Sequence, residues 1–226
     1  MRKALILTAT MLAPAFGLLA ETAQERLRDS AEVLHEIMAT PDKGIPQDLL
    51  AKASCVVVVP GMKKGAFIVG AQYGKGFAIC RKGQGIGWGV PAAVRVEGGS
   101  FGFQIGGSST DVVMLFMNES GMRKLDKDKF TLGADASVAA GPVGRTAAAG
   151  TDAYMNAEIL SWSRAKGLFA GIALNGATLR PDMDDNKELY GQRLTTREVM
   201  STSLPMPEAA RPLTSELDRY SMRKQG

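Results

Sequence analysis

Basic side chains and glycines are the residues in this sequence best placed to bind an anion. Between Asp48 and Glu97 there is no acidic residue, whereas lysine and arginine recur. Most of these cations fall in segments predicted to be turns, and turns at one end of a sheet can lie together. Three or four converging cations, each contributing on the order of 1 kcal/mol, would bind an anionic surface in a salt-sensitive way. The predicted headgroup-binding residues are Lys63, Lys64, Lys75, Arg81, Lys82 and Arg145. The alternative is scattered charge that only keeps the surface soluble.

Four glycines in two predicted loops would let a phosphate approach backbone N–H groups. Gly74 and Gly76 lie in a predicted hairpin turn, and Gly141 and Gly144 lie in a second tight loop. Neither loop has the GxxxxGK[ST] spacing of a nucleotide-binding P-loop. The pattern therefore favours headgroup binding over nucleotide binding.

One short motif could indicate a hydrolase. Residues 98–102, Gly-Gly-Ser-Phe-Gly, satisfy the GxSxG pattern of a nucleophile elbow. That elbow needs a strand-to-helix turn and a histidine that follows the serine in the chain. The single histidine, His35, precedes Ser100 and lies in a predicted helix. We therefore predict that the protein is not an enzyme.

Metal and redox chemistry have few candidate residues. Asp182, Asp184, Asp185 and Asn186 could hold calcium, but they lack the full calcium-loop spacing, and acidic residues are common at a helix N-terminus. With one histidine and two cysteines, no metal site and no cofactor are predicted.

The two cysteines, Cys55 and Cys80, could form one disulfide in an oxidising compartment. Bridging requires Cα atoms within about 7 Å, a distance that the sequence does not show. Two buried thiols are the alternative.

The first twenty residues read as a secretory signal peptide. Arg2 and Lys3 precede an apolar run from Ala4 to Ala20, which is short for a bilayer span of about 20 apolar residues. An uncleaved anchor or a core helix are the alternatives. The prediction places the protein in the periplasm or outside the cell, peripheral at a membrane surface. Loss of this segment lowers the net charge from +4 to +2, so overall charge does not indicate nucleic acid as a partner.

Period-two alternation from Cys55 to Asn118 predicts a β-meander at the centre of the fold. Pro60 and Gly61 are expected to end its first strand, and Ser100–Gly106 is expected to form one strand with an apolar face. The predicted strands are 56–59, 66–72, 77–80, 88–97, 100–106 and 110–118.

Helices are predicted before and after the meander in the chain. An amphipathic helix spans 21–40, where Leu27, Ala31, Leu34 and Met38 share one face. Further helices are predicted over 47–53, 119–127, 182–190, 195–202 and 214–222, with strands within 130–140 and 153–174. The fold class is α+β, an antiparallel twisted β-sandwich or half-barrel with a packed N-terminal helix and short C-terminal helices.

One domain is predicted from residue 21 to 204, with a helical lead-in over 21–53 and a loosely held C-terminal tail over 205–226. Trp88 and Trp162 are expected to pack in the core, with a role as lipid anchors as the alternative.

Several motifs in a fixed order resemble the SYLF-domain family across roughly residues 30 to 200. They are Pro60-Gly61, Lys64-Gly65-Ala66-Phe67, Val69-Gly70, Tyr73-Gly74-Lys75-Gly76, Trp88 with Pro91, Gly106 with Asp111-Val112-Val113, residues 132–137, residues 141–145, Lys166-Gly167-Leu168-Phe169 and Tyr190-Gly191. That family includes yeast and animal SH3-linked actin-patch proteins, plant FYVE-domain proteins and secreted bacterial members. The leader makes this chain similar to the secreted bacterial type.

The resemblance implies a module that binds phosphoinositides or other acidic phospholipids, with actin binding in fungal members and no reaction. A secreted setting argues against actin as the partner here. An envelope protein-interaction or scaffold module, with a protein partner or self-association, is the alternative function.

Overall fold

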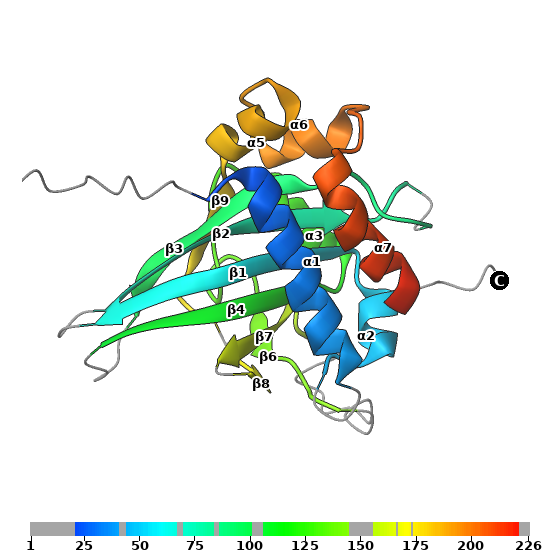
Figure 1. Ribbon diagram of the computed structural model, residues 1–226. Helices are drawn as coiled ribbons and strands as arrows, with labels where there is room; N and C mark the ends of the chain where they lie inside the picture. The colour runs from blue at the N-terminus through cyan, green and yellow to red at the C-terminus, as the bar shows by residue number, and fades with distance from the viewer. Residues whose placement is uncertain are drawn as a thin grey trace, which may run out of the picture.

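The computed structural model of the chain describes residues 21–40, 44–66, 70–83, 86–100, 106–144, 156–165, 167–172 and 174–221 (Figure 1). The predicted signal peptide lies outside these residues. No helix among the described residues is long and apolar enough to cross a bilayer.

The amphipathic helix predicted near the N-terminus is confirmed. Helix α1 spans Ala23–Ala39 and begins with a capping box in which Thr22 and Glu25 bond each other's backbone N–H groups. Leu27, Leu34 and Ile37 are fully buried along its inner face. Figure 1 shows α1 lying across the central strands, so this helix covers one face of the sheet.

The described residues form one nine-stranded sheet in the order β5-β9-β3-β2-β1-β4-β7-β6, with β8 paired to β7. The strands are β1 Cys55–Ala66, β2 Gly70–Cys80, β3 Ala92–Ser100, β4 Gly106–Phe116, β5 Phe130–Thr131, β6 Val138–Ala140, β7 Ile159–Ala165, β8 Leu168–Gly171 and β9 Thr178–Pro181. All pairs are antiparallel except β6 with β7. The sheet curls into an open half-barrel, which confirms one of the two predicted architectures.

Two hydrophobic cores lie on opposite faces of this sheet. Val56 and Val58 of β1 pack on the helix-covered face, whereas Val57 and Val59 pack on the other face. All four side chains are essentially inaccessible. A strand that is buried on both faces has no polar alternation, which is why this run is continuously β-branched.

The remaining helices are short. They are α2 Gln47–Lys52, α3 Glu119–Leu125, α5 Met183–Tyr190, α6 Thr196–Ser201 and α7 Arg211–Tyr220, the last preceded by a 3₁₀ turn over Glu208–Ala210. Leu213 and Leu217 of α7 are fully buried in the same core as α1. The helix expected over 214–222 is present but begins at Arg211, and the expectation that the tail before residue 214 is loosely held is wrong at Ala210 and Leu213, which are fully buried.

The predicted end of the first strand is also wrong. Strand β1 continues through Pro60 and Gly61 as a β-bulge, where the register with β2 shifts between Val58 and Lys63. Gly61 has a φ of 57°, a conformation that glycine adopts without strain. Turn-favouring residues here bend a strand instead of ending it.

Ser100 and Gly106 belong to different strands, and the predicted meander is incorrect at β4, which pairs with β1 and not with β3. Ser100 ends β3 and Gly106 begins β4, and the sheet order places β2 and β1 between those two strands. The intervening residues 101–105, with the expected apolar face, lie outside the described residues.

Candidate surface for binding anions

The five predicted headgroup-binding cations that lie within the described residues do not converge at one end of the sheet. Lys63 and Lys64 lie opposite Tyr73 and Gln72 near the end of the β1–β2 hairpin. Arg81 and Lys82 follow the other end of β2. At about 3.3 Å per residue, Tyr73 and Arg81 are roughly 26 Å apart along that strand. A single cationic rim built from these residues is therefore incorrect.

Two of those cations have partners inside the protein. The Lys75 ammonium lies 2.9 Å from Asp182 Oδ2 and 2.8 Å from Asp185 Oδ1. The Arg81 guanidinium stacks 4.2 Å from the centre of the Trp88 ring and donates a 2.8 Å hydrogen bond to the Ser221 carbonyl. These two charges stabilise the fold. Arg145 lies outside the described residues.

The four glycines predicted to approach a phosphate serve packing instead. A Cβ at Gly76 would lie 2.0 Å from the Val58 carbonyl oxygen, and one at Gly74 would lie 2.7 Å from a Val59 methyl carbon. Both lie within β2 and not in a hairpin turn. The bulged part of β1 lies so close to them that a side chain would not fit.

Gly141 and Gly144 also contact other parts of the chain closely. A Cβ at Gly141 would lie 2.0 Å from the Trp162 ring, and Gly144 donates its N–H to the Gly44 carbonyl at 3.2 Å. Trp162 is fully buried and Trp88 is 3% exposed, so the expected core role of both tryptophans is confirmed.

The structure does create one cationic surface, on the α1 side of the strands that extend beyond the helices (Figure 1). Lys63 faces Tyr73 across β1 and β2 and Ser109 across β1 and β4. Lys63 Nζ lies 3.3 Å from Ser109 Oγ, and the Tyr73 side chain is 45% exposed. Opposed residues share a face, so these three side chains form one row.

A second row carries two arginines. Arg95 of β3 and Arg180 of β9 are register partners in the neighbouring row, which crosses β2 at Lys75, two residues from Tyr73. Both arginines contact the carboxylate of Glu97. The distances are 2.8 Å from Arg95 Nε and 3.5 Å from Arg180 NH1. We define the strand-face cluster as Lys63, Tyr73, Arg95, Glu97, Ser109 and Arg180. It contains three cations and one carboxylate.

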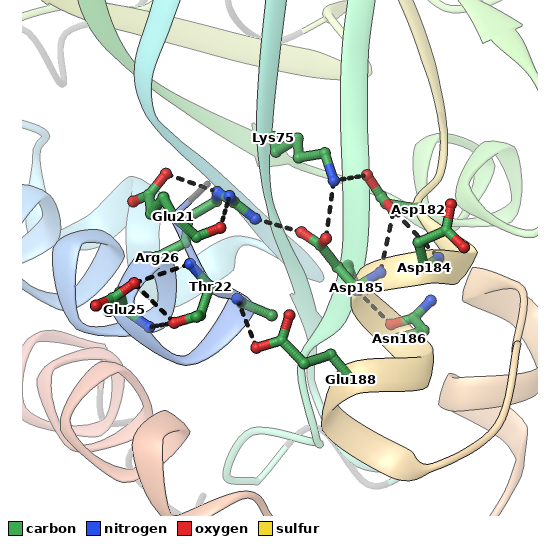
Figure 2. Close-up of polar contacts among 12 residues, drawn as sticks. Glu21, Thr22, Glu25, Arg26, Lys75, Asp182, Asp184, Asp185, Asn186 and Glu188 are labelled. Atoms are coloured by element: carbon green, nitrogen blue, oxygen red, sulfur yellow. Dashed lines mark hydrogen bonds and ion pairs between the residues drawn. The ribbon is translucent and has the colours of Figure 1, made fainter. Parts of the chain in front are cut away.

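A buried ionic network fixes the helices beside this cluster (Figure 2). Arg26 of α1 pairs with Asp185 of α5, and Lys75 of β2 pairs with both Asp185 and Asp182. Burial raises the pKa of Asp182, but the Lys75 ammonium and the Asp185 N–H outweigh it and hold that pKa below its usual value. Burial lowers the pKa of Lys75, and its two carboxylate partners more than reverse that effect.

The same acids form the N-terminus of α5. Asp182 accepts hydrogen bonds from the N–H groups of Asp184 and Asp185, and the Asn186 amide oxygen accepts from the Ala93 N–H at 2.8 Å. Within the described residues there is no group of three or more side chains that could hold a metal ion.

Only the first three residues of the GxSxG segment, Gly98 to Ser100, lie within the described residues, where they end strand β3. His35, on α1, lies 3.1 Å from Glu216 of α7.

At the far end of β2, a disulfide joins Cys55 and Cys80, which are register partners with Cα atoms 4.0 Å apart. An open pocket of about 670 Å³ lies beside it, between the end of β2, α3 and α6. Lys82 and Arg197 both line this pocket.

No sequence pattern selects Arg180 or Arg197. The sequence predicts no strand at Arg180, and the helix that holds Arg197 lies near the end of β2 only in the folded chain. Arg95 and Glu97 did carry a signal. They alternate with the buried Val94 and Val96, which places them on one exposed face.

The fold and these surfaces define an α+β half-barrel with a charged sheet face. A family profile described as "Ysc84: Las17-binding protein actin regulator" matches residues 97–220. The chain belongs to this family, which confirms the resemblance seen in its motifs.

Three relatives show how far the similarity extends. The chain is 36% identical over 172 residues to an SH3 domain-containing protein of Schizosaccharomyces pombe, covering 75% of this chain and 40% of that protein. It is 31% identical over 180 residues to Protein YSC84 of Saccharomyces cerevisiae, covering 78% and 38%. It is 30% identical over 203 residues to human SH3 domain-containing YSC84-like protein 1, covering 89% and 58%. The chain therefore spans roughly two fifths to three fifths of the length of these relatives.

Proposed function

We propose that this domain binds anionic lipid headgroups at a membrane surface, without catalysing a reaction, through the strand-face cluster. The observation that carries the proposal is the row in which Lys63 and Tyr73 oppose each other, both exposed, with Arg95 and Arg180 behind them. Lys64, the next residue on β1, adds a cation on the opposite face of the same strand end.

The chemistry of this row suits a membrane interface. Lysine offers a point charge to phosphate, and tyrosine has an apolar ring with a polar tip that suits the headgroup region. Each cation contributes on the order of 1 kcal/mol, so the whole cluster would bind weakly and lose affinity with salt. Because Glu97 partly neutralises the two arginines, Lys63 should contribute most within the cluster.

A protein partner is the second candidate. The family description and the name LAS seventeen-binding protein 3, given to a relative that is 30% identical over 180 residues, both refer to binding another protein. An envelope protein-interaction module or a self-associating scaffold would use the same exposed strands for protein contact.

Vesicle co-sedimentation separates these candidates. The wild-type protein should pellet with phosphatidylserine-containing vesicles at low salt, less at high salt, and little with pure phosphatidylcholine. The charge-reversal variant K63E/K64E should lose this binding. The matched control K82E/R197E makes the same charge change at the other end of β2 and should bind like wild type.

Equal pelleting with neutral and anionic vesicles would overturn the lipid proposal. If K63E/K64E pellets like wild type while K82E/R197E does not, the strand-face cluster is the wrong site. Retention on an immobilised protein partner without lipid would favour the second candidate.

We also propose that residues 1–20 direct export and that the protein acts in a periplasmic or extracellular setting. The basic start, the apolar run and a disulfide that needs an oxidising compartment support this. N-terminal sequencing of the exported protein should begin at Glu21. A mature chain that begins at Met1 or Arg2 would contradict it.

A further inference from the structure

The pocket beside the disulfide combines an apolar interior with cations at its edge. Met122 of α3, Met200 of α6, Val90 and Leu204 supply partly buried apolar side chains. Cys80 Sγ lies 3.6 Å from Met200 Sδ, so the disulfide forms part of the wall. The sulfur-containing side chains adapt readily to the shape of a ligand.

Three cations line this pocket, Arg81, Lys82 and Arg197, and the last two are available to a ligand. Lys82 and Arg197 are both exposed, and neither side chain has a hydrogen bond or ion pair with any described residue. Lys82 follows the end of β2 and Arg197 lies in α6, more than a hundred residues apart in the chain, and only folding brings them to one pocket. Asp126 is the single acid among the described lining residues, so with Arg81, Lys82 and Arg197 the pocket carries a net charge of +2.

We infer that this pocket binds a single-chain anionic amphiphile, that is, an acyl chain with one negatively charged head. The volume of about 670 Å³ lies within the range of roughly 300 to 1,000 Å³ typical of small-molecule sites. The acyl chain lies against the methionines and the disulfide, and the head lies between Lys82 and Arg197. Asp126 disfavours heads with several negative charges, because a second charge would face its carboxylate.

This ligand chemistry has two sources, a free fatty carboxylate and a lysophospholipid. The inference does not depend on the strand-face cluster, which lies at the opposite end of β2. Either site can bind its ligand when the other fails, and the two tests give separate answers.

NMR of the protein labelled with ¹³C in its methionine methyl groups reports directly on this pocket. Methyl signals of Met122 and Met200 are assigned with Met122→Leu and Met200→Leu. Titration with dodecanoate below its micelle concentration should shift both signals in a saturable way. The cationic dodecyltrimethylammonium should shift neither, and a lauroyl lysophosphatidylglycerol arm shows which head binds more tightly.

The variant K82Q/R197Q should weaken dodecanoate binding at least tenfold while K63Q/K64Q leaves it unchanged. Three results would overturn the inference: no shift of either methionine signal, equal binding of the cationic amphiphile, or wild-type affinity in K82Q/R197Q. An unchanged spectrum of K82Q/R197Q without ligand confirms that this variant folds.

Discussion

Lys75 lies in the interior of β2, and its ammonium nitrogen is 2.9 Å from a carboxylate oxygen of Asp182, the N-cap of α5. The sequence predicts this lysine in an exposed hairpin turn, as one of the residues that bind a lipid headgroup. In the folded chain it instead ties the sheet to α5, and through Asp185 it connects to Arg26 of α1 (Figure 2).

The Asp182 carboxylate should make stability depend on acid pH. Its pKa is lowered in the folded state, so its contribution is complete above the unfolded value of about 3.9 and is lost as the pH falls through the folded pKa. D182N should lower the free energy of unfolding near neutral pH by about 2 to 4 kcal/mol and flatten its acid dependence. Urea unfolding at several pH values measures both effects.

The matched control is D184N, the same substitution two residues further along the chain. Asp184 pairs with Arg193 in an exposed ion pair, which is worth at most about 1 kcal/mol. If D184N lowers the free energy of unfolding as much as D182N does, burial of the Asp182 carboxylate is not the reason for its contribution. Lys75, whose pKa is raised, contributes below its unfolded pKa and should lose that contribution only in strong alkali.

Arg26 and Asp185 should be energetically coupled. Their side chains are 7% and 9% exposed, and removal of one partner leaves the other charge buried. R26M and D185N should each cost about 3 kcal/mol, and the double variant should cost at least about 1 kcal/mol less than the sum. R28A, on the exposed face of the same helix, should change stability by under about 0.5 kcal/mol. Strict additivity in the cycle would refute the coupling.

Gly76→Ala and Gly65→Ala should differ sharply, although both glycines lie in the β1–β2 hairpin. An alanine Cβ at position 76 would meet the Val58 carbonyl oxygen at 2.0 Å, whereas position 65 has no heavy atom within 4 Å. We expect G76A to cost about 2 to 4 kcal/mol in urea unfolding and G65A to be nearly neutral. If both behave alike, close strand packing is not the reason for glycine at 76.

Removal of the disulfide should destabilise the domain. The bond joins residues 25 apart in sequence, for which the chain-entropy relation gives roughly 3 kcal/mol. C55A/C80A should therefore unfold at lower urea concentration than the oxidised wild type. Wild type measured with a reductant provides the control, and it should match the variant. Unchanged stability in both would show that strand pairing alone holds these ends.

Local patterns predicted much of this fold correctly. The spacing of Leu27 and Leu34 placed α1, and the β-branched run from Val56 to Val59 predicted a strand that is buried on both faces. These predictions succeeded because helical and strand periods are local properties of the chain. The family was also recognisable from the order of its motifs.

Turn-forming residues misled the prediction of β1 and β2. Pro60 with Gly61 forms a bulge, and Gly74 with Gly76 lies under it. Proline and glycine favour a turn when read locally, but the same residues also permit a bulge and a close approach between strands. Only the pairing partner distinguishes the two outcomes.

The sequence by itself determined the α+β class, the presence of central strands and the excess of basic residues over the first half of that region, but not the pairing of β4 with β1. The tertiary structure decided which charges are available at the surface, because a side chain's partner can lie more than a hundred residues away, as Asp182 does from Lys75. It also decided which cations are neighbours, since strand register set Lys63 beside Tyr73 and helix packing set Arg197 near Lys82.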